Sequence, residues 1–256
     1  MNTSAAALLE QLTPLMRDAG QVIMDIYATD FDVTKKGDES PVTQADQKAE
    51  TVILAGLAKI APGVPVVAEE AVAAGNIPDV SDRFFLVDPL DGTKEFISRN
   101  GEFTVNIALI EHGKPVLGLV YAPAIGRMFT GAVGVGAWVE DKDGKRAIQC
   151  RAVPAEGLTV VASRSHGDET ALDAFLGGRK VASRTNAGSS LKLCLVAAGE
   201  ADLYPRLGRT MEWDIAAGDA VLRAAGGRVT VVADGADLRY GKPGFDNPHF
   251  AASGLA

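Results

Sequence analysis

The stretch Phe84-Phe85-Leu86-Val87-Asp88-Pro89-Leu90-Asp91-Gly92-Thr93-Lys94-Glu95-Phe96 is the part of the sequence around which the fold is organised. Its first four residues form a short apolar run bounded by turn residues, which predicts a strand buried on both faces. Pro89 removes a backbone donor and Gly92 tolerates a sharp turn. We therefore expect Asp88 and Asp91 to lie close together where the strand ends.

Two carboxylates held this close repel each other unless one is protonated or a cation lies between them, and a site made only of oxygen atoms suits Mg²⁺. Gly92 and Thr93 then open onto a predicted helix start, where free N–H groups and the helix dipole favour a phosphate. Asp, Pro and Gly are also ordinary turn residues, so the pentapeptide 88–92 alone is equally compatible with a plain strand-to-turn connection. Acidic residues elsewhere must decide between these interpretations.

Composition limits the classes of function. The chain has 256 residues, of which 47% are hydrophobic and 23% charged, as in an ordinary globular protein with a full core. Its formal net charge of -8 argues against nucleic acid as a main partner, because a polyanion-binding surface needs an excess of Lys and Arg. A small phosphorylated substrate is compatible with this charge, since metal ions and a few local bases override it.

Cysteine spacing and hydropathy predict the cellular location. Cys150 and Cys194 form neither a metal-binding spacing nor a disulfide framework, so we expect reduced core thiols in a cytoplasmic protein. The apolar stretch Ala5–Leu9 lacks a preceding basic region, and no stretch approaches the roughly 18 apolar residues of a membrane-spanning helix. No lipidation or polybasic signal supports attachment to a membrane. Peripheral association with the inner membrane stays an alternative, because such attachment does not require these signals. The sequence does not report the oligomeric state.

Further acidic residues precede the central stretch. A helix predicted from about Thr43 carries Asp46 in its first turn, where the simplest interpretation is a capping-box partner or an acid favoured by the helix dipole. The apolar run Val64–Ala68 predicts a second buried strand, and it ends in Glu69 and Glu70. In α/β sheets, ligand sites gather at the carboxyl ends of strands. Two strands that both end in carboxylates therefore favour one shared site.

Residues 1–151 are predicted to form an α+β half. An amphipathic helix over Leu8–Ile26, capped by Thr3 or Ser4, precedes a strand over Phe31–Lys36. Short hairpin-like links join the strands that follow the central stretch, so we expect an antiparallel sheet. These strands are predicted over Phe103–Ile110, Pro115–Tyr121 and Arg127–Ala132.

From about residue 152 strands alternate with helices, which predicts a smaller α/β half over 152–256. No low-complexity linker separates the halves, so we expect one rigid unit. The predicted strands are Leu158–Ala162, Lys180–Ser183, Ala201–Tyr204 and Arg228–Val232, and the helices are Asp168–Leu176, Ser189–Ala198 and Asp214–Ala225.

Residues that could carry chemistry are sparse in this half, and each has a simpler interpretation when taken alone. Asp214 at a helix start is typical of a helix cap, and His166 after a strand is typical of a solvated loop. Lys192, flanked by leucines, could extend from an apolar helix towards solvent. Arg206 follows another strand.

Four motifs taken together resemble the inositol monophosphatase superfamily of Mg²⁺-dependent, lithium-sensitive phosphatases. They are Gly37-Asp38-x-Ser40-Pro41-Val42-Thr43-x-x-Asp46, Glu69-Glu70, Asp88-Pro89-Leu90-Asp91-Gly92-Thr93 and Trp213-Asp214-x-Ala216-Ala217-Gly218. The resemblance spans almost the whole chain in order, so it outweighs the capping and turn interpretations. It implies an α/β (α+β) fold layered α-β-α-β-α, sugar-phosphatase-like, with an antiparallel N-terminal sheet.

Within that superfamily, further motifs are most similar to the CysQ-type 3′(2′),5′-bisphosphate nucleotidases. An inositol monophosphatase would usually have a small apolar residue near Lys192 and an acid near Arg206, whereas both are basic here. Two bases suit a substrate with a second phosphate. The implied activity is hydrolysis of 3′-phosphoadenosine 5′-phosphate to AMP and phosphate, together with activity on the 5′-phosphosulfate analogue. The motifs are 91–96, 163–166, 188–192 and 203–206.

The resemblance also implies roles for individual residues. Asp46 and Thr93 would take the proton from the attacking water, and the backbone N–H groups of Gly92 and Thr93 would orient the phosphate. Two or three Mg²⁺ ions are implied, with Li⁺ as an inhibitor. Their ligands would be Glu69, Asp88, Asp91, Asp214 and the carbonyl of Leu90, and the substrate contacts would be His166, Ser189, Lys192, Arg206 and Asp214.

Two alternatives remain at this point. One is an inositol or sugar phosphatase that uses the same acids. The other is a non-catalytic interaction protein that keeps the fold, and the unbroken acidic set argues against it. The chain beyond Gly235 retains only a loose family-like ending, Phe245–Pro248, to which we assign no function.

Overall fold

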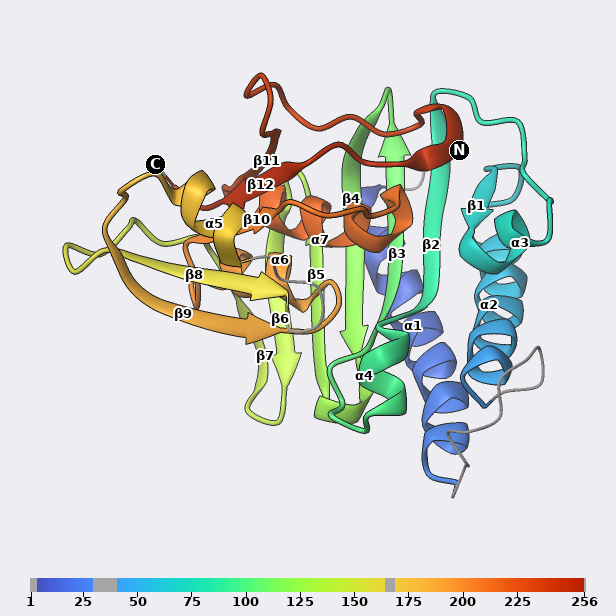
Figure 1. Cartoon of the computed structure of the whole chain (residues 1–256). Coiled ribbons are helices and arrows are strands. Elements are labelled where there is room, and N and C mark those ends of the chain that lie inside the picture. Colours follow the sequence, from blue (N-terminus) through green and yellow to red (C-terminus); the bar gives the residue numbers. More distant parts are fainter. Residues whose placement is uncertain (1–3, 30–40, 164–168, 256) are drawn as a thin grey trace.

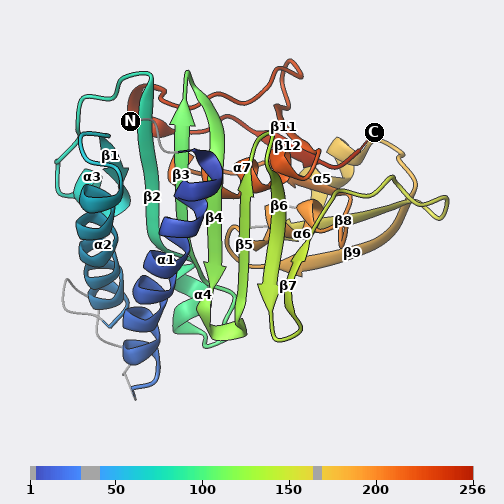
Figure 2. The same ribbon diagram turned by 180° about the vertical axis from the view of Figure 1, so that it is seen from behind.

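A computed structural model describes residues 4–29, 41–163 and 169–255. The described residues form two sheets separated by a layer of helices (Figures 1 and 2). The larger sheet has the order β1-β2-β3-β4-β5-β6-β7 and the smaller one the order β11-β12-β10-β8-β9. The helices are α1 (Ala5–Tyr27), α2 (Pro41–Ile60), α3 (Glu69–Ala73), α4 (Thr93–Ile97), α5 (Glu169–Leu176), α6 (Leu191–Ala197) and α7 (Glu212–Ala224), with short 3₁₀ turns at Pro123–Ile125 and Pro243–Phe245.

The helices and sheets are layered in the predicted order α-β-α-β-α. Helices α1 and α2 cover one face of the larger sheet, α6 and α7 lie between the sheets, and α5 packs on the outer face of the smaller sheet. The larger sheet contains β1 (Val66–Ala68), β2 (Arg83–Asp91), β3 (Thr104–Glu111), β4 (Lys114–Ala122), β5 (Arg127–Ala132), β6 (Gly136–Asp141) and β7 (Gly144–Ala147), and the smaller one β8 (Leu158–Ser163), β9 (Val181–Ala187), β10 (Leu203–Arg206), β11 (Arg228–Val231) and β12 (Phe250–Ser253).

Strand β2 is buried on both faces, as its apolar run predicts. Phe85 and Val87 pack with α1 and α2, whereas Phe84 and Leu86 pack on the opposite side with residues of α6 and α7. Alternate side chains of one strand thus contribute to two cores, because successive residues point to opposite faces of a sheet. This double cover fixes the position of β2, whose last residues include Asp88 and Asp91.

The larger sheet is antiparallel from β2 to β7, as predicted, but β1 joins it as a parallel edge strand. Ala68 of β1 is in register with Val87 of β2. Because both strands run in the same direction, Glu69 and Asp88 emerge at the same edge of the sheet. The parallel pair therefore produces the shared carboxyl end that the two acidic strand ends indicate.

Helix α7 lies unusually close to the larger sheet. A Cβ at Gly118 would overlap the carbonyl oxygen of Ala217, and one at Gly131 would lie 2.8 Å from the Cα of Val221. These two glycines of β4 and β5 let the helix backbone rest on the strands, which places the first turn of α7 beside the end of β2. The core formed here includes residues of both halves of the chain.

Several boundaries differ from the predictions. The predicted strand over 31–36 lies outside the described residues, whereas Ser4 does cap α1 by accepting a hydrogen bond from the Ala7 N–H at 3.2 Å. Helix α7 begins at Glu212, two residues before the predicted start. Strand β12, in the segment without an assigned role, lies between β10 and β11. Within the described ranges, no helix combines the length and apolar character that a membrane crossing requires.

Both cysteines are free and buried, which agrees with the prediction of core thiols. Burial raises the pKa of the Cys150 thiol to about 11 and that of Cys194 still further. Neither thiol is therefore a reactive thiolate near neutral pH.

Candidate active site

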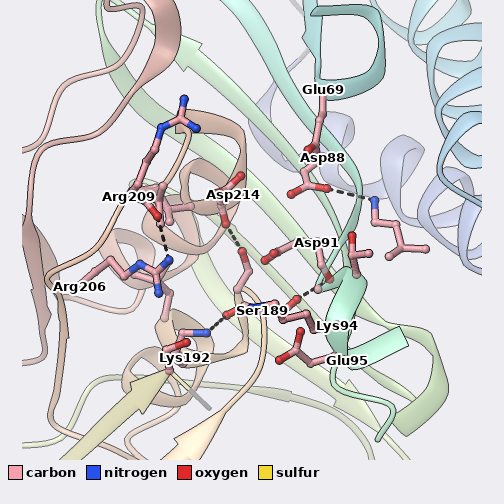
Figure 3. Close-up of a pocket in the computed structure, with 18 of the residues that line it drawn as sticks. Glu69, Asp88, Asp91, Lys94, Glu95, Ser189, Lys192, Arg206, Arg209 and Asp214 are labelled. Atoms are coloured by element: carbon pink, nitrogen blue, oxygen red, sulfur yellow. Dashed lines mark hydrogen bonds between the residues drawn. The ribbon is translucent and has the colours of Figure 1, made fainter. Parts of the chain in front are cut away.

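A cavity of about 340 Å³ lies where β1, β2, β10 and the first turn of α7 meet (Figure 3). Glu69, Asp88 and Asp91 lie on one side of it and Lys192, Arg206 and Arg209 on the other, while Lys94 and Glu95 of α4 lie together below Asp91 (Figure 3). The carboxylates in its wall are Glu69, Asp88, Glu95, Asp91 and Asp214, and the cations are Lys94, Lys192, Arg206 and Arg209. The predicted residues Leu90, Gly92, Thr93 and Ser189 also line it.

Three structural features bring the carboxylates together. Glu69 begins α3 directly after β1, and Asp88 and Asp91 lie at the end of β2, where the pairing with β3 shifts register. Asp214 belongs to the first turn of α7. The register shift marks an irregular strand end, and such irregularities redirect side chains. Strand β2 itself continues through Asp91, so the turn predicted after Val87 is wrong and a register shift within the strand takes its place.

The acidic side of the cavity carries strongly raised pKa values. Burial, followed by repulsion from Asp91 and other neighbours, raises the pKa of Glu69 to about 7 and that of Asp214 to about 8. Burial also raises the pKa of Asp91 and raises that of Asp88 well above its ordinary value. Carboxylates that are buried and repel one another are stabilised when a cation joins them.

Asp46 is a member of this electrostatic group, and its interpretation as a helix cap is wrong. Helix α2 begins at Pro41 and has no acidic residue in its first turn, so Asp46 lies too far along the helix to cap it. Its side chain is buried, and its Oδ1 has no hydrogen-bond partner. Burial and the charges of Glu69 and Glu70 raise its pKa to about 9.

The donor set fits Mg²⁺. The carboxylates and the Leu90 carbonyl are hard oxygen ligands, and a buried carboxylate oxygen of Asp46 is unpaired. In the described residues, no three acidic, His or Cys side chains are already arranged to hold an ion. Two carboxylates instead accept local backbone bonds, Asp88 from the Leu90 N–H at 3.1 Å and Asp214 from the Met211 N–H at 2.9 Å. The fit therefore rests on ligand chemistry and electrostatics.

The raised pKa values predict how stability depends on pH in the metal-free protein. Asp46 and Asp214 have ordinary values of 3.8 and folded values of about 9 and about 8. The folded state therefore binds more protons than the unfolded state across this window, so the free energy of unfolding should fall as pH rises from about 4 to about 9. Their stabilising contribution is complete below the unfolded pKa and is lost above the folded one.

Urea unfolding of chelator-treated protein at several pH values measures this slope. Asp46→Asn should make the slope shallower, and saturating Mg²⁺ should nearly remove it, because a bound cation replaces the protons. A metal-free protein whose stability rises through the window would contradict the electrostatic account of the site.

The basic side of the cavity is formed by Lys192 and Arg206. Lys192 is buried, which rules out the interpretation that its ammonium extends into solvent. Its Nζ donates to the carbonyls of Ser189 and Ala187 and lies 5.4 Å from the ring centre of Tyr204. Burial lowers its pKa to about 8. Arg206 donates to the carbonyl of Arg209 at 2.9 Å, while its buried Nε has no partner.

Two serines join the sides of the cavity. Ser189 has a left-handed backbone, with φ of 51°, and its Oγ donates to the carbonyl of Asp91 at 2.6 Å. Ser190 Oγ donates to the carbonyl of Asp214. A positive φ is costly for a residue other than Gly, and such strain persists where surrounding contacts over-determine it. The pair thus fixes the acidic residues of both halves relative to each other.

Sequence reasoning missed some members of this site. Glu95, Ser190, Tyr204, Arg209 and Thr210 line the cavity. Glu95 and Tyr204 belong to motifs that carry the family resemblance, so they could have been selected, but no spacing rule indicates that they face the cavity. His166 lies outside the described residues.

Residues 5–253 match the family described as the inositol monophosphatase family. The chain is 51% identical to the 3′(2′),5′-bisphosphate nucleotidase CysQ of Escherichia coli (strain K12). The similarity extends over 224 residues, which are 87% of this chain and 89% of that protein. It is 42% identical to the CysQ nucleotidase of Buchnera aphidicola over 97% of this chain and 94% of that protein. The crystal structure of CysQ from Bacteroides thetaiotaomicron, a bacterial member of the same family, has a TM-score of 0.84 and 37% identity, with 96% of each chain covered.

Proposed function

Because this chain belongs to the inositol monophosphatase family, we propose that it is a metal-dependent 3′(2′),5′-bisphosphate nucleotidase. It hydrolyses 3′-phosphoadenosine 5′-phosphate to AMP and phosphate, and it converts the 5′-phosphosulfate analogue to adenosine 5′-phosphosulfate. One observation carries the proposal: a cluster of buried and half-buried carboxylates faces Lys192 and Arg206 across a single cavity. Such a cavity offers one place for the reacting phosphate and another for a second anionic group.

The carboxylate side provides the reaction centre. Glu69, Asp88, Asp91, Asp214 and the carbonyl of Leu90 would hold two or three Mg²⁺ ions. Bound Mg²⁺ lowers the pKa of water, orients the phosphate and neutralises its developing charge. In this proposal, residues 1–151 supply most of the metal ligands, and residues 152–256 supply Asp214, Lys192 and Arg206.

Other groups of the chain position the reactants and move the proton. Asp46 and Thr93 take the proton from the attacking water, as the family resemblance implies. Because burial and repulsion from Glu69 and Glu70 raise the pKa of Asp46 to about 9 without metal, cations bound to the neighbouring carboxylates would lower it and leave the carboxylate ionised as the base. The N–H groups of Gly92 and Thr93, at the start of α4, orient the phosphate. Gly92 has φ of 99°, a conformation that a side chain would strain.

The basic side determines which substrate is preferred. Lys192 acts as a point charge and Arg206 as a planar fork with an unpaired Nε, which together suit the 5′-phosphate of a nucleotide. An inositol monophosphate has no second phosphate for these cations. A buried cation left without an anion is unfavourable, so the basic pair selects against the inositol phosphatase alternative.

Phosphorus NMR of the products tests this assignment. With 3′-phosphoadenosine 5′-phosphate as substrate, we expect the 3′-phosphate signal to disappear while AMP and inorganic phosphate form in equal amounts. Formation of adenosine 3′-phosphate would mean that the substrate binds in the opposite orientation. A chain that releases no phosphate would instead support the non-catalytic alternative.

Lithium should inhibit the enzyme at concentrations in the millimolar range, as membership of this lithium-sensitive superfamily implies. Li⁺ is a small hard cation with one charge, so it can occupy an oxygen site without supplying the charge of Mg²⁺. The measurement is phosphate release at fixed Mg²⁺ with LiCl, with KCl at equal ionic strength as the control. Equal rates in the two salts would speak against this mechanism.

The two cysteines bear on the cellular location of the protein. We propose that the protein acts in the cytoplasm, where its two buried, free cysteines would stay reduced.

A further inference from the structure

The segment Arg239–Asn247 packs against the first turn of α7 through a buried acid. Glu212 is fully buried, and both of its carboxylate oxygens have donors from this segment. Oε2 accepts from the Gly241 N–H at 2.7 Å, and Oε1 accepts from the Lys242 N–H at 2.9 Å and from Lys242 Nζ at 2.6 Å. Because a buried carboxylate is costly unless it is paired and hydrogen-bonded, these contacts fix the segment on α7.

The same lysine orients Asn247. Lys242 Nζ donates to Asn247 Oδ1 at 3.1 Å, so the amide nitrogen must face the other way. Asn247 Nδ2 donates to the carbonyl of Met211 at 2.8 Å, and the Asn247 backbone N–H donates to the carbonyl of Thr210 at 2.9 Å. The asparagine therefore holds the end of the loop that leads from Arg206 into α7.

Met211 connects this asparagine to the acidic side of the cavity. The carbonyl of Met211 accepts from Asn247, and its N–H donates to Asp214 Oδ2 at 2.9 Å. One peptide residue is thus held from both sides. The bond fixes one oxygen of Asp214 against the backbone, which sets the direction of the other oxygen in the cavity wall.

We propose that Asn247 is a positioning residue for Asp214, acting through the backbone of Met211. The inference rests on the proposed function, because the orientation of Asp214 has a consequence only if this carboxylate binds metal. Groups that orient a metal ligand without touching the metal typically change metal affinity by about 10- to 100-fold. The sequence pattern Glu212-x-Asp214 places the anchor of the segment and the oriented ligand two residues apart in one helical turn.

Asn247→Asp tests this role in the full-length chain. Aspartate has the shape of asparagine and keeps an oxygen for Lys242, but it places an acceptor against the Met211 carbonyl where a donor is needed. We expect the Kd for Mg²⁺ to rise about tenfold, measured by calorimetry without substrate. Asn247→Ala removes the donor without adding a charge and gives the same comparison if the aspartate variant does not fold.

Tyr240→Phe is the matched control. It removes the hydrogen bond from Tyr240 Oη to Asp219 Oδ2, 2.9 Å long, which joins the same segment to the same helix beyond Asp214. This variant should lower the melting temperature and leave the Kd for Mg²⁺ unchanged. Wild-type affinity in Asn247→Asp and Asn247→Ala, or an equal loss in the Tyr240→Phe control, would overturn the proposal.

The two hypotheses fail in different ways. Calorimetry requires no turnover, so a chain that binds Mg²⁺ but hydrolyses no bisphosphate would refute the proposed function and leave this comparison valid. A wild-type chain with nucleotidase activity whose Mg²⁺ affinity does not depend on Asn247 would refute only the positioning role.

Discussion

Asp91→Asn should reduce kcat by about three orders of magnitude and, at the same time, stabilise the metal-free protein. Asp91 lies at the centre of the acidic group, and its charge raises the pKa of both Glu69 and Asp214. Loss of a ligand removes much of the charge stabilisation that a bound metal supplies, which is worth several kcal/mol. In the metal-free state, however, the amide relieves repulsion between buried carboxylates.

Opposite signs for activity and stability make this a demanding prediction. Phosphate release in the presence of Mg²⁺ measures the first effect, and thermal unfolding in the presence of a chelator measures the second. Asp143→Asn, in the exposed turn between β6 and β7, is the control and should change neither quantity. An Asp91→Asn variant that is both inactive and less stable without metal would indicate a structural role for this acid.

Arg206→Ala should raise the KM for 3′-phosphoadenosine 5′-phosphate by about 30-fold and change kcat much less. A hydrogen bond between charged groups contributes about 2 kcal/mol, which corresponds to this factor. Arg206 suits this test better than Lys192, because the Lys192 ammonium also donates to the carbonyl of Ser189, and Ser189 in turn contacts Asp91. Replacing the lysine would therefore disturb both sides of the cavity.

Arg209→Ala is the matched control for Arg206. Arg209 lies in the same loop and also lines the cavity, but it is largely exposed and already pairs with Asp246 at 2.8 Å. We expect a small change in KM for this variant. In the Arg206→Ala variant, kcat/KM for inositol 1-phosphate should be almost unaffected. Equal losses on both substrates would mean that Arg206 binds the reacting phosphate.

The sequence predicts the layers of the fold because its buried strands are strongly patterned. The run Phe84–Val87 is apolar at every position, and the structure covers both faces of β2. Strand β12 was not recognised, since Phe250–Ser253 is short and pairs only with strands distant in sequence. Local pattern does not reveal such pairing, because tertiary contacts decide it.

The acidic site was only partly predictable from local rules. The closeness of Asp88 and Asp91 could be predicted, although they lie on an irregular end of β2 and not in a turn after it. The local interpretation of Asp46 as a cap was wrong. Its burial depends on the packing of α2 against β2, which local spacing does not report. The part played by Asn247 also depends on the folded chain, since it contacts Met211 across 36 positions of sequence.

Metal dependence and substrate preference are tested together by phosphate release from 3′-phosphoadenosine 5′-phosphate and from inositol 1-phosphate. Each is measured with Mg²⁺ and with a chelator, and the values of kcat/KM are compared. A carboxylate site opposite Lys192 and Arg206 predicts Mg²⁺-dependent turnover with a strong preference for the nucleotide. A preference for inositol 1-phosphate would contradict the role assigned to the two cations, and turnover that persists in the chelator would contradict the metal site itself.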